Sequence, residues 1–204
     1  MRRIPLSHRS HIIGFQPMAT GSTEHESALE RDFVTLTSFL HPQASIISQP
    51  VTLRFSDGST LRRYTPDYSV RYSADKAELI EVKYWKDLRA RFGLLKPGFS
   101  VARDWARERR MSFRIVTERS IRGPILEHAK RLLPLRHAPV DSTLAEFALR
   151  AIGTSSATTF GEVLAALPAG RETGLATLWR MIARRSLYVD FTTPITYRSP
   201  VSLT

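Results

Sequence analysis

Apolar residues in the first part of the chain change between helical and strand spacing. The first expected element is a helix that opens near residues 22–24 and ends at His41-Pro42. Its apolar face consists of Leu29, Phe33, Leu36 and Leu40. Further along, the turn residues Ser56-Asp57-Gly58-Ser59 predict a hairpin, because Gly58 can take a positive φ. The other expected elements are strands over 44–49, 50–55, 61–72 and 77–85, a break at Lys96-Pro97-Gly98, a helix over 99–110 and a strand over 111–117.

From about residue 121 the pattern becomes mainly helical. The expected helices span 125–133, 141–152, 158–167 and 171–185, and short strands follow over 186–191 and 195–197. The last three of these helices, followed by a hairpin, outline a winged helix. The sequence therefore predicts an N-terminal arm over 1–20 that is ordered loosely or only on a partner, a mixed α/β domain over 21–120 and a small winged-helix-like domain over 121–204.

Composition and charge narrow the possible functions. The 204 residues contain no cysteine, which excludes a disulfide framework, a thiolate zinc site, a thiol nucleophile and iron–sulfur chemistry. The basic N-terminus lacks the apolar stretch of a secretory signal, and no run of about eighteen apolar residues occurs, so we expect a cytoplasmic protein without a membrane partner.

The net charge points to a polyanionic partner. Thirty Lys and Arg against nineteen Asp and Glu give +11, and arginine supplies 25 of the thirty. Guanidinium groups match phosphate oxygens, so this balance favours nucleic-acid binding. Codon usage and solubility are the alternative explanation.

Three charged residues gather on two predicted strands. Asp67 follows Pro66, and thirteen residues separate it from Glu81. Glu81 and Lys83 lie two apart on one strand, so their side chains share a face, while Val82 points into the core. Such groups are costly to desolvate unless they bind something. The alternative is an aspartate in a turn and a Glu–Lys pair on a solvated sheet face.

This arrangement suits metal-dependent hydrolysis of a phosphodiester. Two carboxylates with open coordination positions favour Mg²⁺, and the Val82 carbonyl is a candidate further ligand. An ammonium group such as that of Lys83 can orient or deprotonate a water molecule and offset charge in the transition state.

These residues resemble the signature of the PD-(D/E)xK, or restriction-endonuclease-like, nucleases. The expected order of helix, strands, helix and strand is similar to the core of that superfamily. A closer resemblance is to the TnsA endonucleases of heteromeric bacterial transposases, and it extends over nearly the whole chain after the arm. The matching stretches are Ser27-Ala28-Leu29-Glu30, Gln49-Pro50, Thr65-Pro66-Asp67-Tyr68-Ser69-Val70, Ile80-Glu81-Val82-Lys83 and the winged-helix outline.

The resemblance implies a role for each site residue. Glu30 would be the helix carboxylate that completes the metal site, with Glu24 and Glu26 as rivals if the register differs. Asp67 would be the central metal ligand and Glu81 the second, although some family members carry glutamine at the second position. Lys83 would activate water or compensate charge. The cofactor would be Mg²⁺, with Mn²⁺ as a substitute.

The resemblance also implies a function and partners. The chain would cut one strand at each 5′ end of a transposon, leaving 5′-phosphate and 3′-hydroxyl products. A DDE transposase, TnsB, would cut and join the 3′ ends, and an AAA+ regulator, TnsC, would contact the C-terminal region. The protein would then act at the nucleoid of a bacterial cell.

Two other functions fit the same sequence. One is a stand-alone restriction or repair nuclease with the same fold. The other is a non-catalytic DNA-binding or assembly factor, in which the winged helix acts and the charged cluster is a relic. In that case Arg180 and Arg184, which share a face of the helix predicted over 171–185, would be candidates for base reading.

Overall fold

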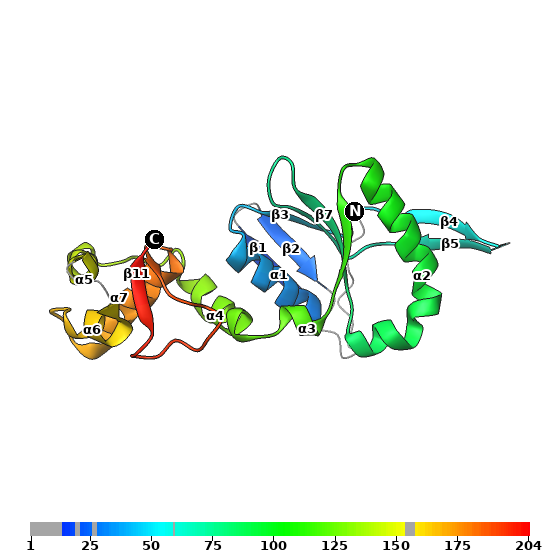
Figure 1. Cartoon of the computed structure of the whole chain (residues 1–204). Helices are drawn as coiled ribbons and strands as arrows, with labels where there is room; N and C mark the ends of the chain where they lie inside the picture. Colours follow the sequence, from blue (N-terminus) through cyan, green and yellow to red (C-terminus); the bar gives the residue numbers. More distant parts are fainter. Residues whose placement is uncertain (1–13, 19–20, 26–27, 59, 154–157) are drawn as a thin grey trace. The chain divides into compact units, whose positions relative to one another are not determined.

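The computed structural model describes residues 14–18, 21–25, 28–58, 60–153 and 158–204, which form two compact units divided between Arg122 and Gly123 (Figure 1). In chain order, the first unit contains β1 (Gly14–Met18), β2 (Gly21–His25), α1 (Ala28–Leu40), β3 (Ser45–Ser48), β4 (Leu53–Asp57), β5 (Thr60–Tyr64), β6 (Tyr68–Arg71), β7 (Ala77–Val82), α2 (Trp85–Glu108), β8 (Ser112–Val116) and α3 (Glu118–Ile121).

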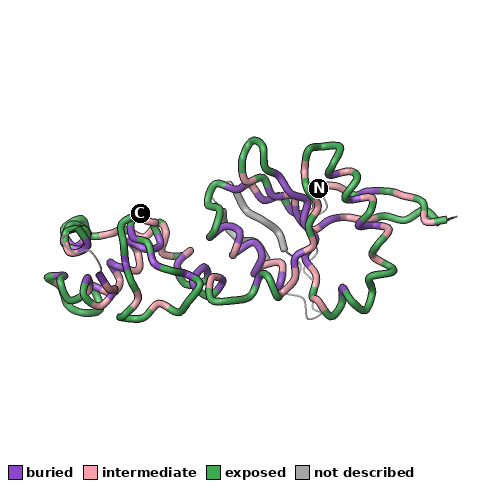
Figure 2. The backbone as a smooth tube through the Cα atoms, in the orientation of Figure 1, coloured by how far each residue is buried: buried purple, intermediate pink, exposed green. Residues whose placement is uncertain are grey.

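A mixed four-stranded sheet forms the centre of the first unit. Its order is β3-β6-β7-β8. The pairs β3–β6 and β6–β7 are antiparallel, and β8 runs parallel to β7. Every residue of β7 is buried, because helices cover both faces of the sheet (Figure 2). On one face the Tyr68 ring packs on Phe33 of α1, and on the other Leu79 packs on Ala102 of α2. A mixed sheet flanked by helices agrees with the expected α/β class.

The predicted hairpin is present as β4 and β5, which form a separate two-stranded sheet and extend away from the central sheet (Figure 1). Gly58 has φ +66°, the left-handed conformation that its place in the turn requires. Leu53 and Tyr64 at the base of the hairpin pack with residues of α2. The hairpin is thus fixed at its base.

The start of the first helix was predicted too early. Residues 21–25 form a strand paired with β1, and α1 begins at Ala28. Gly21, Ser22 and Thr23 are weak helix formers, so pairing with residues 14–18 prevails. The predicted arm therefore includes a strand.

The strands around the site are shorter than predicted, and the second helix is longer. The segment 61–72 divides at Thr65-Pro66-Asp67, and the strand expected over 77–85 ends at Val82. Lys96-Pro97-Gly98 does not break the chain, because α2 continues through Pro97 and is bent along its length (Figure 1). Leu88 before the proline and Phe99 after it are both buried, so packing of the two halves overrides the cost of Pro97.

The second unit is a helical cluster with a small sheet. Its elements are α4 (Pro124–Leu132), η1 (Leu133–Leu135), α5 (Ser142–Gly153), β9 (Thr158–Thr159), α6 (Phe160–Ala165), α7 (Arg171–Ala183), β10 (Leu187–Tyr188) and β11 (Pro200–Leu203). Asp141 caps α5 by accepting a hydrogen bond from the Leu144 N–H at 3.0 Å, and Thr159 with Glu162 forms a capping box on α6. The buried side chains of Leu178 and Ile182 lie in its core.

The hairpin expected at the end of this unit differs from the one observed. The strand predicted over 195–197 lies instead at Pro200–Leu203, where it pairs with both β10 and β9. The carbonyls of Tyr197 and Ser199 accept hydrogen bonds from the Gly161 and Phe160 N–H groups, so these loop residues satisfy the start of α6 and are not available to a hairpin.

Among the described residues, no helix is both long and apolar enough to span a membrane.

Candidate active site

Asp67 lies between β5 and β6 and is held by two backbone contacts. Its Oδ2 accepts a hydrogen bond of 2.7 Å from the Val82 N–H on β7. Its own carbonyl accepts one of 2.7 Å from the Gln49 N–H. Gln49 has φ +46°, an uncommon conformation for a side-chain-bearing residue. These contacts fix the direction of the Asp67 carboxylate.

Glu81 and Lys83 project from the end of β7 toward Asp67. The Lys83 Nζ lies 2.8 Å from the Glu81 Oε1 and 3.9 Å from the Asp67 Oδ2. The Glu81 side chain is almost fully buried, and about two thirds of the Lys83 side chain is covered. The three residues that the spacing singled out therefore converge on one point. Val82, between them, contributes its N–H to Asp67 and buries its side chain.

Glu30 reaches the same region from α1. The hydroxyl of the buried Tyr68 donates a long hydrogen bond of 3.4 Å to the Glu30 Oε2. The charge of Glu30 also contributes to the raised pKa of Asp67, so the two carboxylates lie within electrostatic reach. Of the rival glutamates, Glu26 lies outside the described residues, and Glu24 is part of β2.

The carboxyl groups of the cluster interact electrostatically with one another and with Lys83. Burial, together with the charges of Glu81 and Glu30, raises the pKa of Asp67 well above its ordinary value, although Lys83 and the Val82 N–H oppose this rise. Burial alone would lower the pKa of Lys83, but Asp67, Glu81 and Glu30 together raise it. The raised pKa keeps Lys83 protonated beside these carboxyl groups.

Tyr64 is a site residue to which the sequence pattern assigned no role. Its hydroxyl donates a hydrogen bond of 2.6 Å to the Glu81 Oε2. Burial, with the nearby charges of Glu81 and Asp67, raises the pKa of Tyr64, which therefore remains a donor. Gly98 of α2 makes room for its ring, because a Cβ at that position would lie 3.0 Å from the Tyr64 Cγ. A single tyrosine before Thr-Pro-Asp carries no recognisable signal in the sequence.

Tyr64→Phe should weaken the site without removing a charge. We expect it to cost about 1–3 kcal/mol of unfolding free energy, because the buried Glu81 loses a donor, and to reduce strand cleavage roughly tenfold. Tyr72→Phe is the matched control, because the Tyr72 hydroxyl donates a hydrogen bond of 3.2 Å to Glu78, which is not part of the cluster. Urea unfolding and a cleavage assay would test both. An equal loss of cleavage in the two variants would contradict a specific role for Tyr64.

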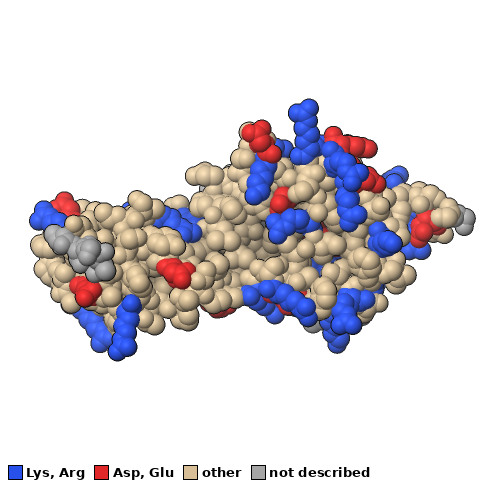
Figure 3. All heavy atoms as spheres, viewed as in Figure 1, with Lys and Arg blue, Asp and Glu red and all other residues tan. Residues whose placement is uncertain are grey.

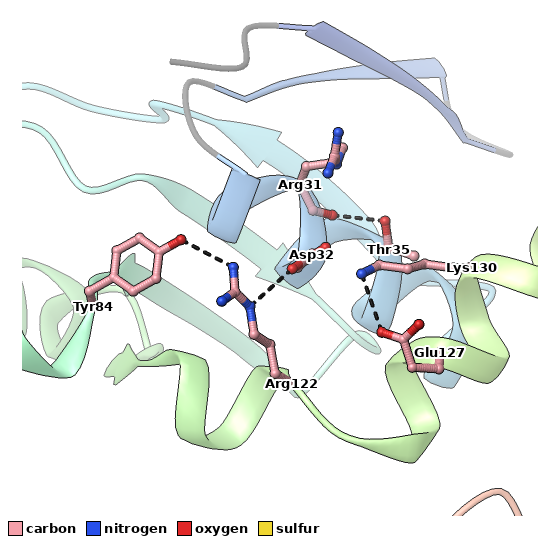
Figure 4. Close-up of polar contacts among 7 residues, drawn as sticks. All are labelled: Arg31, Asp32, Thr35, Tyr84, Arg122, Glu127 and Lys130. Carbon is pink, nitrogen blue, oxygen red and sulfur yellow. Dashed lines mark hydrogen bonds and ion pairs between the residues drawn. The ribbon is translucent and has the colours of Figure 1, made fainter. Parts of the chain in front are cut away.

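Arg122 connects two segments that carry site residues (Figure 4). Its Nε lies 3.3 Å from the Oδ2 of Asp32 on α1, two residues after Glu30. Its NH2 group donates a hydrogen bond of 3.1 Å to the hydroxyl of Tyr84, the neighbour of Lys83. Arg122 thereby fixes α1 against the segment that follows β7. The contact spans 90 residues of sequence between Arg122 and Asp32, so no local pattern could have indicated it.

The carboxylates do not form a ready-made metal site. Among the described residues, no group of three or more Asp, Glu, His or Cys side chains is arranged to hold a metal ion. Asp67 is held by Val82, and Glu81 by Lys83 and Tyr64. A cation would therefore compete with contacts that the protein already makes.

The arginines at the C-terminal end of α2 have partners within the protein. Arg107 pairs with Asp104, and Arg109 pairs with Glu108 and stacks on Trp105. Such exposed pairs contribute little to stability. In the second unit, Arg180 donates to the Pro139 carbonyl, which gives it a structural contact.

One comparison with known proteins identifies the site region. Residues 44–118 match the family model described as TnsA-like endonuclease N terminal, which covers less than half of the chain. This stretch contains Asp67, Glu81 and Lys83 and all four strands of the central sheet. The region is therefore similar to the N-terminal domain of TnsA-like endonucleases, and the resemblance inferred from the sequence is confirmed there. No curated protein matches the chain.

Proposed function

We propose that this protein is a Mg²⁺-dependent DNA endonuclease subunit of a heteromeric transposase. One observation carries the proposal. Within the region that matches the TnsA-like endonuclease model, Lys83 lies within 4 Å of both Asp67 and Glu81 at one end of the buried strand β7. Metal-assisted hydrolysis of a phosphodiester needs carboxylates that hold a cation and a positive group that offsets charge on the phosphate. Asp67 and Glu81 can supply the first, and Lys83 the second.

The donor set fits a hard divalent cation. Asp67 has a raised pKa because it is buried near two other carboxylates, so a cation at this point would relieve repulsion. Asp67 and Glu81, with Glu30 and the Val82 carbonyl, would hold Mg²⁺, and Mn²⁺ would substitute for it. When bound, the cation supplies Lewis-acid stabilisation and lowers the pKa of a bound water molecule.

The protein's own residues prepare the site. The Val82 N–H orients the Asp67 carboxylate, and the Tyr64 hydroxyl orients Glu81. Lys83 is protonated and partly exposed, so its ammonium group can face the scissile phosphate and offset charge that develops there. Lys83 would also position the attacking water molecule.

We further propose a division of labour with partner proteins. This chain would hydrolyse one strand at each 5′ end of the transposon, while a DDE transposase of the TnsB type acts on the 3′ ends. The second unit, in which α5, α6 and α7 precede β10 and β11, supports a winged-helix-like domain. That domain would contact an AAA+ regulator of the TnsC type.

Cleavage of end-labelled transposon-end DNA in Mg²⁺ tests this proposal. The wild type, Asp67→Ala and the control Asp104→Ala, which removes an exposed carboxylate, would be compared with and without the transposase. We expect the wild type and Asp104→Ala to cut at the 5′ ends only when the transposase is present. Asp67→Ala should not cut in either mixture. Cutting by the wild type in the absence of the transposase would favour a stand-alone nuclease. Identical behaviour of all three proteins would favour a non-catalytic binding factor.

A further inference from the structure

The β4–β5 hairpin carries two arginines in an unfavourable position. Arg54 on β4 lies directly opposite Arg63 on β5. Directly opposed residues of an antiparallel pair project from the same face, and like charges there destabilise the pair. Both arginines are exposed, and neither makes an ion pair or side-chain hydrogen bond within the described residues.

The two faces of the hairpin differ in character. The face that bears Leu53 and Tyr64 packs with α2 at its base, and farther out it carries an ion pair of 2.9 Å between Arg62 and Asp57. The opposite face, which we call the outer face, carries Arg54, Arg63, Ser56 and Leu61. All four are exposed, Leu61 by 72%. Among the described residues of the hairpin, the outer face alone combines uncompensated charge with an exposed apolar side chain.

The outer face is connected to the site by a short segment. Tyr64 follows Arg63 and donates to Glu81, and Asp67 comes three residues later. A ligand held by Arg63 would therefore lie on the strand that leads into the site. The surface view shows other Lys and Arg side chains standing out from the first unit, with fewer Asp and Glu side chains among them (Figure 3).

We propose that the outer face of the β4–β5 hairpin binds the phosphate backbone of duplex DNA. Arg54 and Arg63 would each contact a phosphate, which removes their mutual repulsion, and Leu61 would contact the adjoining sugar surface. A protruding two-stranded ribbon has dimensions that a DNA groove admits. This proposal rests on the proposed function, because it assigns a further contact for the same DNA substrate.

Fluorescence anisotropy of a fluorescein-labelled duplex tests the proposal. The protein would carry Asp67→Asn, so that no cleavage intervenes, and Arg54→Gln, Arg63→Gln and Arg62→Gln would be compared in that background. Each removes one positive charge, but Arg62 lies on the other face and pairs with Asp57, which makes Arg62→Gln the matched control. We expect Arg54→Gln and Arg63→Gln each to weaken binding roughly five- to tenfold near 0.1 M salt and to lower the salt slope by about 0.9. Arg62→Gln should leave the slope unchanged.

A second measurement separates binding from folding. Urea unfolding should show that Arg54→Gln and Arg63→Gln keep or raise the midpoint, because each removes a like-charge contact. Equal slopes for all three variants, or a parent protein without salt-dependent binding, would overturn the proposal. The proposal would also be overturned if Arg54→Gln and Arg63→Gln bound DNA like the parent protein but lost association with the transposase. That result would show that the outer face binds a protein. The binding assay requires no cleavage, so its failure is distinct from failure of the proposed function.

Discussion

Asp67→Asn should abolish strand cleavage and at the same time stabilise the cation-free protein. We expect cleavage to fall about 10³-fold or more, which corresponds to about 4 kcal/mol of lost transition-state stabilisation. The amide retains an oxygen that can accept the Val82 N–H, so the local fold should persist. The loss would then reflect a missing charge at the centre of the site.

The stability gain follows from the raised pKa of Asp67. A carboxyl whose pKa is higher in the folded than in the unfolded state contributes stability at low pH, and that contribution is lost as the pH rises through the folded pKa. As the pH rises toward that raised pKa, Asp67 therefore lowers the stability of the fold, and Asp67→Asn removes this cost.

Thermal unfolding in EDTA across a pH series measures this effect. The midpoint of Asp67→Asn should exceed that of the wild type near neutral pH, and the difference should shrink as the pH falls below the raised pKa. Asp104→Asn, which alters an exposed carboxylate, is the control and should show no such pH-dependent difference. A destabilised Asp67→Asn protein at neutral pH would show that the carboxylate has a structural role instead.

Lys83→Met should be the second most damaging substitution. It keeps most of the side chain's length but leaves the nearly fully buried Glu81 without its ion-pair partner at 2.8 Å. Breaking a buried pair in this way costs about 3–5 kcal/mol, and because a third of Lys83 is exposed we expect about 1–3 kcal/mol. Cleavage should fall roughly 10²-fold or more, since charge compensation at the phosphate is lost.

A double-mutant cycle separates the two contributions of Lys83. Glu81→Gln in the Lys83→Met background removes the unpaired charge, so it should recover part of the stability but none of the cleavage. Urea unfolding gives the coupling energy, and the cleavage assay gives the activity. Strictly additive losses of stability would show that the observed contact is energetically unimportant.

The residues that the sequence could indicate are those whose signal is local. Gly58 in its turn, and the position of Glu81 and Lys83 two residues apart at the end of β7, follow from conformational rules that act over a few residues. The site contacts of Tyr64 and Arg122 depend on partners 17 and 90 residues away, so they required the structure. The convergence of Asp67 on Glu81 lies between these cases, because it was inferred from a family-like spacing.

Two of the mistaken elements share a physical cause. Pro97 is tolerated in α2 because buried residues anchor the helix on both sides of it. The last strand falls at Pro200–Leu203 because residues before it bond to the start of α6. In both cases tertiary contacts outweigh the local conformational preference.

The central claim is that the carboxylates around Asp67 bind a divalent cation. Isothermal titration of the protein with Mn²⁺ tests it most directly, with wild type, Asp67→Asn and Asp104→Asn measured at neutral pH. We predict saturable binding to the wild type and to Asp104→Asn, and its loss in Asp67→Asn. Equal binding by all three proteins, or none by the wild type, would contradict the claim.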